Sequence, residues 1–131
     1  MATVNVMSVR LPYDPRAART ARELVDEFLV ALGADEELRQ DAALVVHELV
    51  MNSVVHGQPD PDGEIELTWR LADSQFEISV LDRGSGGVVE VRHPDDESPN
   101  GRGLAIVAAL STSWWVDHST GTRVTARLAL A

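Results

Sequence analysis

The sequence predicts an α+β fold, a two-layer sandwich of helices on a largely antiparallel sheet. The expected elements follow the order strand, two helices, two strands, a long loop, one helix and two strands. This order favours two layers over a doubly wound parallel sheet. Four of the five strands form two pairs with short turns, and such hairpins are antiparallel. No repeat or linker interrupts the 131 residues, so we expect a single domain over 1–131.

The first half of the chain is expected to supply one strand and two helices. Asp14 is suited to cap a helix, with Pro15 at its first position, where a missing N–H costs nothing. Gly33 ends that helix, and Gly57 is the stop signal of the next. The expected elements are a strand at Thr3–Leu11 and helices at Asp14–Leu32 and Asp35–His56.

The second half is expected to hold two hairpins, a long loop and a third helix. Apolar and polar residues alternate in each expected strand, which is typical of a sheet with one buried face. The loop Gly84–Gly101 is unusually long for a compact domain, and such loops are often functional lids. The other expected elements are strands at Glu64–Leu71 and Gln75–Leu81, a helix at Arg102–Leu110, and strands at Thr112–His118 and Arg123–Leu130.

The charge and composition exclude several classes of function. All 11 basic residues are arginines, against 21 acidic residues, which gives a formal net charge of −10. Without lysine, neither a Walker-A lysine nor a Schiff base is available. The negative charge argues against a nucleic-acid partner, and the absence of cysteine excludes disulfides and thiolate metal sites. The longest uncharged stretch, Gly103–Val116, is shorter than the about 20 residues of a membrane span. With no secretory signal in view, we expect a cytoplasmic protein without a membrane partner.

The second expected helix carries polar residues on an apolar surface. Glu48, Asn52 and His56 follow one another at four-residue spacing and therefore share a face. The helix is apolar nearly all round, which predicts that it is buried. A buried carboxylate or amide costs roughly 2–7 kcal/mol unless it is satisfied. Glu48 and Asn52 either bond locally or form a site, and the helix alone does not decide between them. For His56, the favoured interpretation is a helix C-terminal residue stabilised by the dipole.

Other polar residues are expected near the ends of neighbouring elements. Asp82 shares the parity of the apolar residues of its strand, so it should point into the core, and glycines follow it. Thr122 has the same inward parity in the last strand. Gly101 and Gly103 open the third helix and leave N–H donors that can face an anion. Each feature alone also fits an ordinary turn or loop.

Taken in order, four segments resemble the boxes of the GHKL, or Bergerat-fold, ATPases, which include gyrase, Hsp90 and histidine kinases. The segments are Glu48–Gly57, Asp82–Gly86, Gly101–Leu104 and Gly121–Thr122. The resemblance covers about 14–130, and the helix start after Gly103 is similar to that of RsbW-type anti-sigma factor serine kinases. It implies a mostly antiparallel mixed sheet with helices on one face, and ATP and Mg²⁺ as cofactors.

The resemblance also implies a role for each matching residue. Asn52 would be the Mg²⁺ ligand and Glu48 the general base that activates the attacking hydroxyl. Asp82 would bind the adenine amine, supported by Thr122. Gly84 and Gly86 would make room for adenine and ribose, and Gly101, Arg102, Gly103 and Leu104 would hold the phosphates through main-chain N–H groups.

Two functions of different classes follow from this resemblance. The first is a serine protein kinase that phosphorylates a STAS-domain anti-anti-sigma factor and sequesters a sigma factor; a homodimer is also compatible. The second is a nucleotide-dependent protein-binding module with negligible kinase activity, which Arg83 and the acidic residues 95–97 favour. A third outcome is a degenerate domain that binds no nucleotide.

Two other segments resemble metal-binding motifs but lack residues that those motifs require. His47–Glu48 resembles the start of a zinc-protease motif, but Met51 stands where the second histidine is required. Asp60–Gly63 resembles part of a calcium loop, yet the remaining ligands are missing, so we expect a turn.

Overall fold

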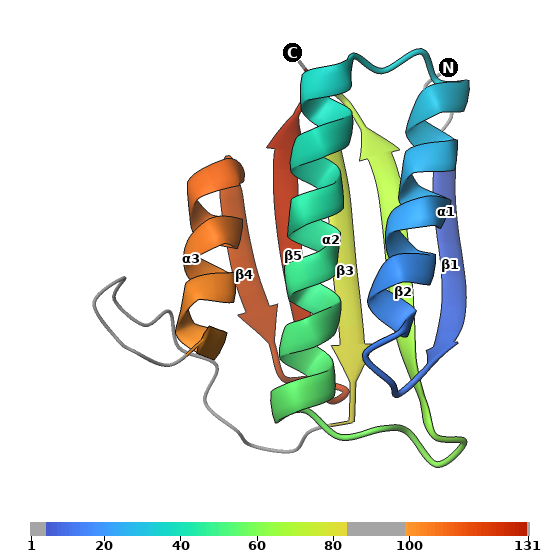
Figure 1. Cartoon of the computed structure of the whole chain (residues 1–131), viewed down its shortest axis with the longest axis vertical. Helices are drawn as coiled ribbons and strands as arrows, with labels where there is room; N and C mark the ends of the chain where they lie inside the picture. The colour runs from blue at the N-terminus through green and yellow to red at the C-terminus, as the bar shows by residue number, and fades with distance from the viewer. Residues whose placement is uncertain (1–4, 84–98, 131) are drawn as a thin grey trace.

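Alternating apolar residues give the sheet one buried face, and three helices cover that face (Figure 1). The computed structural model describes residues 5–83 and 99–130. Its elements are β1 (Asn5–Pro12), α1 (Ala17–Ala31), α2 (Glu36–His56), β2 (Glu64–Ala72), β3 (Gln75–Asp82), α3 (Pro99–Leu110), β4 (Ser113–Asp117) and β5 (Thr122–Ala129). The α+β two-layer sandwich is confirmed, and each expected helix and strand is found, although the starts of α1 and α3 differ from expectation.

The five strands are arranged in the order β1-β2-β3-β5-β4. Every pair among the described residues is antiparallel, so the expectation of a mixed sheet is wrong there. β5 enters between β3 and β4, and this places the residues at the C-terminal end of β3 beside those at the N-terminal end of β5.

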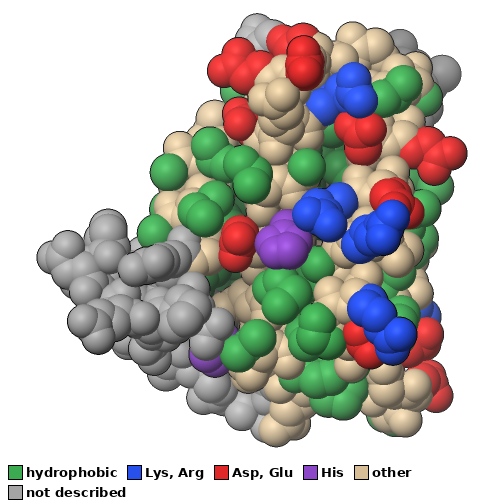
Figure 2. Space-filling view, viewed as in Figure 1, with side chains coloured by type: hydrophobic (Ala, Val, Ile, Leu, Met, Phe, Trp, Pro, Cys, Tyr) green, Lys and Arg blue, Asp and Glu red, His purple; other side chains and the backbone are tan. Residues whose placement is uncertain are grey.

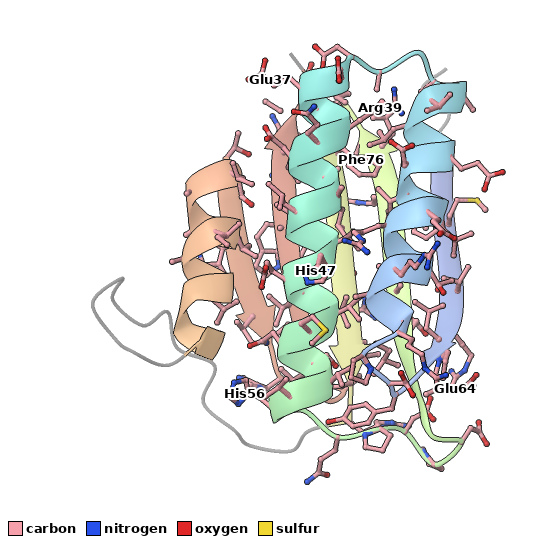
Figure 3. The ribbon with its side chains drawn as sticks, in the orientation of Figure 1. Glu37, Arg39, His47, His56, Glu64 and Phe76 are labelled. Atoms are coloured by element: carbon pink, nitrogen blue, oxygen red, sulfur yellow. The ribbon has the colours of Figure 1, made fainter. Side chains whose placement is uncertain are left out.

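The core lies between the helices and the inner face of β2, β3 and β5. Phe28 of α1 stacks on Phe76 with ring centroids 6.0 Å apart and meets the edge of Trp69 at 6.1 Å. Phe76 lies between α1 and α2 in the view of Figure 3 and is fully buried. Burying one such large apolar side chain contributes about 1.5–3 kcal/mol.

Helix α1 begins later than expected. The prediction that Asp14 caps it is wrong, because the helix starts at Ala17 with Arg16 as N-cap and no side-chain cap bond. Asp14 instead accepts a hydrogen bond from the backbone N–H of Arg16 at 2.8 Å, as in an Asx turn. Gly33 adopts a φ of 75° just after the helix, in agreement with its predicted role as a terminator.

Helix α2 begins and ends where predicted but is not buried all round. Asp35 caps it by accepting from the N–H of Leu38 at 2.8 Å, and the helix ends at His56. Leu44 and Val55 are each 49% exposed, so the prediction of a fully buried helix is wrong. Apolar side chains gather on the outer surface of the helix layer (Figure 2). Periodicity could not show this, since the exposed and buried sides of α2 have nearly the same apolar character.

Helix α3 begins at Pro99, three residues before the expected start at Arg102. The strands β4 and β5 differ from expectation by only one residue at each end. Within 5–83 and 99–130, no helix is long and apolar enough to cross a bilayer.

The face of the sheet opposite the helices carries paired charges. Glu77 is 9% exposed and accepts from Arg70 at 3.0 Å and from Arg127 at 2.9 Å. The guanidinium of Arg127 also lies 5.2 Å from the centroid of the Trp115 ring. Burial disfavours the charged form of Glu77, but the hydrogen bonds and charges of the two arginines outweigh it and lower the pKa of this carboxyl.

Candidate functional site

Asp82 and Thr122 lie opposite each other at one end of the sheet. They are register partners across β3 and β5, and only 5% and 6% of their surfaces are exposed. The predicted shared layer of the two side chains is therefore confirmed. The C-terminal ends of α2 and β3 and the N-terminal end of α3 lie at this same end of the molecule (Figure 1).

The carboxylate of Asp82 is held against the last turns of α2. Ser53, 3% exposed, donates its hydroxyl proton to Oδ2 of Asp82 at 3.0 Å. Gly57 lies so close that a Cβ at this position would overlap Oδ2 and would stand 2.6 Å from the carbonyl oxygen of Ser53. The close approach of α2 to β3 therefore depends on a glycine at position 57.

A second glycine lies on the backbone side of Asp82. Gly121 has a φ of 133°, a conformation that side chains rarely adopt. A Cβ there would also overlap the carbonyl oxygen of Asp82. Glycines from two different segments thus allow the chain to close around Asp82 from both sides.

Tyr13, from the turn between β1 and α1, contacts the same place. Its hydroxyl donates to the carbonyl oxygen of Gly57 at 2.7 Å. Burial, together with the negative charge of Asp82, raises the pKa of Tyr13. Three segments distant in the sequence therefore meet around one carboxylate.

Glu48 extends from α2 toward the first turns of α3. A Cβ on Gly103 would stand 2.6 Å from Oε2 of Glu48, so the glycine gives this carboxylate its space. Gly103 and Leu104 are both buried. Of the expected phosphate-binding residues, Gly101 and Arg102 are described only as helical backbone of the same first turns.

Asn52 lies one helical turn beyond Glu48 and is half-buried. Its amide oxygen is the kind of hard ligand that Mg²⁺ takes in proteins. His56 follows after one more turn, exposed in the last turn of α2 (Figure 3). That position suits a charge favoured by the helix dipole, in agreement with the preferred interpretation.

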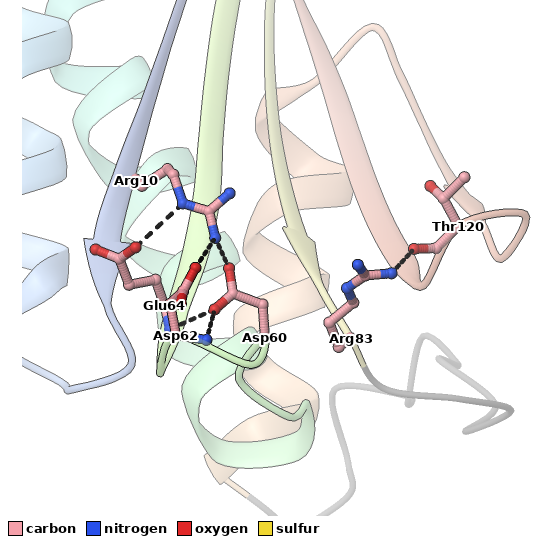
Figure 4. A network of polar contacts seen from close by, with 6 residues as sticks. All are labelled: Arg10, Asp60, Asp62, Glu64, Arg83 and Thr120. Carbon is pink, nitrogen blue, oxygen red and sulfur yellow. Dashed lines mark hydrogen bonds and ion pairs between the residues drawn. The ribbon is translucent and has the colours of Figure 1, made fainter.

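Arg83, directly after Asp82, points away from this cluster. Its backbone N–H donates to Gln58 at 2.9 Å, and its exposed guanidinium reaches the carbonyl oxygen of Thr120 at 3.5 Å (Figure 4). Gly84 and Gly86, the expected room for adenine and ribose, lie outside the described residues, as does most of the expected lid.

Three acidic side chains between α2 and the start of β2 form ion pairs with an arginine of the same chain. Asp60, Asp62 and Glu64 offer carboxylate oxygens within 4.8 Å of one another. Arg10 of β1 forms ion pairs with all three (Figure 4). Asp60 also accepts from the N–H groups of Asp62 and Glu64, as expected for a turn.

Ser53 and Gly57 lie within the segment that resembles the first box, but neither was given a role in the site, and Tyr13 was not among the predicted residues. A hydroxyl on the sheet-facing side of α2 was the one available signal for Ser53. No local pattern indicates Tyr13, because its contact with Gly57 joins positions 44 residues apart.

The fold and the residues around Asp82 and Glu48 define a class of protein. The model of the histidine kinase-like ATPase domain matches residues 11–128, and the chain belongs to this family. The chain is 32% identical over 77 residues to an anti-sigma F factor of Shouchella clausii. This match covers 56% of this chain and 53% of that protein. It is 28% identical over 94 residues to the serine-protein kinase RsbW of Listeria innocua, covering 70% and 60% of the two chains.

A solved structure agrees with these relatives. The crystal structure of the RsbU and RsbW domains of Rv1364c from Mycobacterium tuberculosis matches with a TM-score of 0.74 and 29% identity. The match covers 96% of this chain and 32% of that one. The chain thus spans between 53% and 60% of the length of the two curated relatives described above.

Proposed function

We propose that this chain is an ATP-dependent serine protein kinase that also acts as an anti-sigma factor. The observation that carries the proposal is the Glu48 carboxylate, held at the first turns of α3 by the space that Gly103 leaves. The N-terminal turn of a helix is suited to phosphate, and a carboxylate beside it can take a proton from an attacking hydroxyl. The serine kinase RsbW of Listeria innocua is among the relatives.

In the proposed reaction, ATP binds between α2, α3 and the end of β3. The adenine amine donates to Asp82, supported by Thr122, while Gly84 and Gly86 make room for the base and ribose. Main-chain N–H groups of Gly101–Leu104 hold the phosphates. Glu48 accepts the proton of the acceptor serine, whose oxygen bonds to the γ-phosphorus as the bond to the bridging oxygen breaks and ADP leaves.

The donor set of this region fits Mg²⁺. Asn52 offers an amide oxygen one turn from Glu48, and this protein has no lysine to neutralise a polyphosphate. We propose Asn52 as the metal ligand. When bound, Mg²⁺ supplies the positive charge that stabilises the transferring phosphoryl group.

The proposed partners follow from the relatives. One of them is named an anti-sigma F factor, and we propose a sigma factor as the sequestered partner in the cytoplasm. The proposed acceptor of the phosphoryl group is a serine of a STAS-domain anti-anti-sigma factor. A homodimer would be compatible with both interactions.

The test is phosphoryl transfer from labelled ATP to the STAS-domain proteins encoded in the same genome. Glu48→Gln should abolish labelling while retaining ATP binding by calorimetry. Glu37→Gln, at the exposed start of α2, is the matched control and should label its partner like the wild type. If wild type and Glu48→Gln label no partner, the kinase proposal is wrong.

Calorimetry separates the remaining alternatives. Binding heat for ATP that requires Mg²⁺ and disappears in Asn52→Ala, without phosphoryl transfer, would favour the nucleotide-dependent binding module. Gln40→Ala, exposed near the start of α2, controls for the loss of an amide on this helix. No heat with any protein would favour a degenerate domain.

A further inference from the structure

The turn between β4 and β5 carries a histidine beside the buried Thr122. Nδ1 of His118 lies 3.4 Å from the hydroxyl oxygen of Thr122. We infer that His118 is a positioning residue: its neutral form takes the hydroxyl proton of Thr122, and its protonated form turns that proton into the site. Nucleotide affinity therefore rises as His118 is protonated. The inference rests on the proposed function, in which Thr122 supports the bound base.

The turn holds His118 in this place through contacts of its own. Asp117, the last residue of β4, accepts from the backbone N–H of Ser119 at 2.9 Å and from its hydroxyl at 2.7 Å. At the other end of the turn, Gly121 has the φ of 133° with which the chain closes against the end of β3. His118 itself is exposed, whereas Thr122 is only 6% exposed. The imidazole can therefore exchange protons with water while Nδ1 lies against a buried hydroxyl.

The charge of the imidazole decides which of the two groups donates. A neutral ring with its proton on Nε2 has a lone pair on Nδ1 and accepts from Thr122, whose oxygen then offers only lone pairs to other neighbours. A protonated ring donates from Nδ1, so the Thr122 oxygen accepts and its own proton turns elsewhere. Thr122 is the register partner of Asp82 and shares its layer. A proton turned away from His118 can therefore be donated to a lone pair at the edge of the bound base.

Charged groups from several elements lie around this turn. Hydrogen bonds from Ser119, with smaller contributions from the charges of Arg123 and His118, lower the pKa of Asp117. Asp117 is therefore ionised throughout the range in which histidine changes charge, and arginine stays protonated there. The charged neighbours are Asp117 of β4, Arg123 of β5, Asp82 at the end of β3, and Arg83, which reaches the carbonyl oxygen of Thr120.

The first test uses the free protein in an NMR titration between about pH 5.5 and 8. The side-chain signals of Thr122 should shift with the same midpoint as the ring signals of His118, because the hydroxyl reverses when the ring is protonated. The ring nitrogen shifts should place the proton of the neutral form on Nε2. Thr122 signals without this midpoint, or a neutral ring protonated on Nδ1, would overturn the inference.

The second test measures the affinity for ATP with Mg²⁺ by calorimetry over the same range. The affinity of wild type relative to His118→Gln should be about fivefold higher at the acidic end than at the alkaline end. The ratio cancels the ionisation of the ATP phosphates, which both proteins share. His56→Gln, which removes the exposed histidine in the last turn of α2, is the matched control and should show the same rise. A rise that disappears in His56→Gln and persists in His118→Gln would overturn the inference.

Thr122→Val separates the role of the hydroxyl from a simple effect of charge. If His118 acts through Thr122, then adding His118→Gln to Thr122→Val should change ATP affinity less than about twofold at either end of the range. A direct attraction between the imidazolium and the phosphates would persist in that background. Its persistence would contradict the positioning role.

The outcomes separate the inference from the function beneath it. If wild type binds no ATP at any pH, both are wrong. If wild type binds ATP and its affinity relative to His118→Gln is the same at both ends of the range, the proposed function stands and the role of His118 is overturned.

Discussion

Around Asp82, individual atoms decide what the site can do. The Ser53 hydroxyl and the Gly57 backbone, both from the end of α2, lie against one carboxylate, and Tyr13 from the turn before α1 bonds to Gly57. Replacing one atom of that carboxylate should therefore affect both a ligand and a neighbouring side chain.

Asp82→Asn removes the charge and retains the shape. Tyr13 is the chain's one tyrosine, so an absorbance titration reports on it alone. The pKa of Tyr13 should fall toward 10.0 without reaching it, because burial, the larger cause of its rise, remains. ATP affinity should fall about 10-fold or more. An unchanged Tyr13 titration would contradict the electrostatic effect of Asp82 on Tyr13.

Gly103→Ala tests the space given to Glu48. The new Cβ would displace the end of a flexible side chain, so the fold should tolerate it, and alanine favours a helix by about 1 kcal/mol over glycine. We expect a melting temperature no lower than that of wild type, near-normal ATP binding and at least about a 10-fold lower phosphoryl-transfer rate. A normal rate would show that the observed position of Glu48 is unimportant for transfer.

At the scale of elements, α2 carries most of the site and depends on its cap. Asp35 accepts from the N–H of Leu38 at 2.8 Å. Asp35→Ala should lower the free energy of unfolding by about 1 kcal/mol in denaturant titrations. Glu36→Ala in the same first turn serves as control and should have a smaller effect, because it removes a dipole interaction and an exposed hydrogen bond from Gln40 but no cap.

The charged face of the sheet should make stability depend on acid pH. The pKa of Glu77 is lower in the folded state, so its contribution is complete above the ordinary value of 4.5 and is lost as pH falls through the folded-state value. Glu77→Gln should lower stability at neutral pH by about 1 kcal/mol, since the pairs are partly exposed. It should also flatten the decline below pH 4.5. Equal slopes for both proteins would contradict this role of Glu77.

The sequence predicts an element or a contact well only when the residues that determine it lie close together along the chain. The strands and α2 follow from patterns within a few residues, and strand parity predicts that Asp82 and Thr122 share a layer, although not that they are register partners. The contact of Ser53 with Asp82 could not be predicted, because it joins residues 29 positions apart. The predicted start of α1 was wrong because Asp14 bonds within its own turn, three residues before the helix begins at Ala17.

At the scale of the whole molecule, the charge of −10 opposes the binding of a polyphosphate. Mg²⁺ should therefore provide much of the charge compensation. We expect ATP affinity, measured by calorimetry, to fall at least about 10-fold on chelation of the metal. Raising the salt concentration in the chelated sample should recover part of it by screening. Affinity insensitive to chelation would contradict the proposed metal dependence.

The place of β5 in the sheet has a consequence for how the protein is made. Thr122 and Gly121, which complete the surroundings of Asp82, leave the ribosome about 40 residues after Asp82 itself. Until β5 pairs, β3 is an unpaired edge and the end of α2 faces an incomplete neighbour. Contacts between segments so distant in sequence form slowly. The nascent chain should therefore acquire ligand binding in one late step, and truncation before position 121 should abolish it.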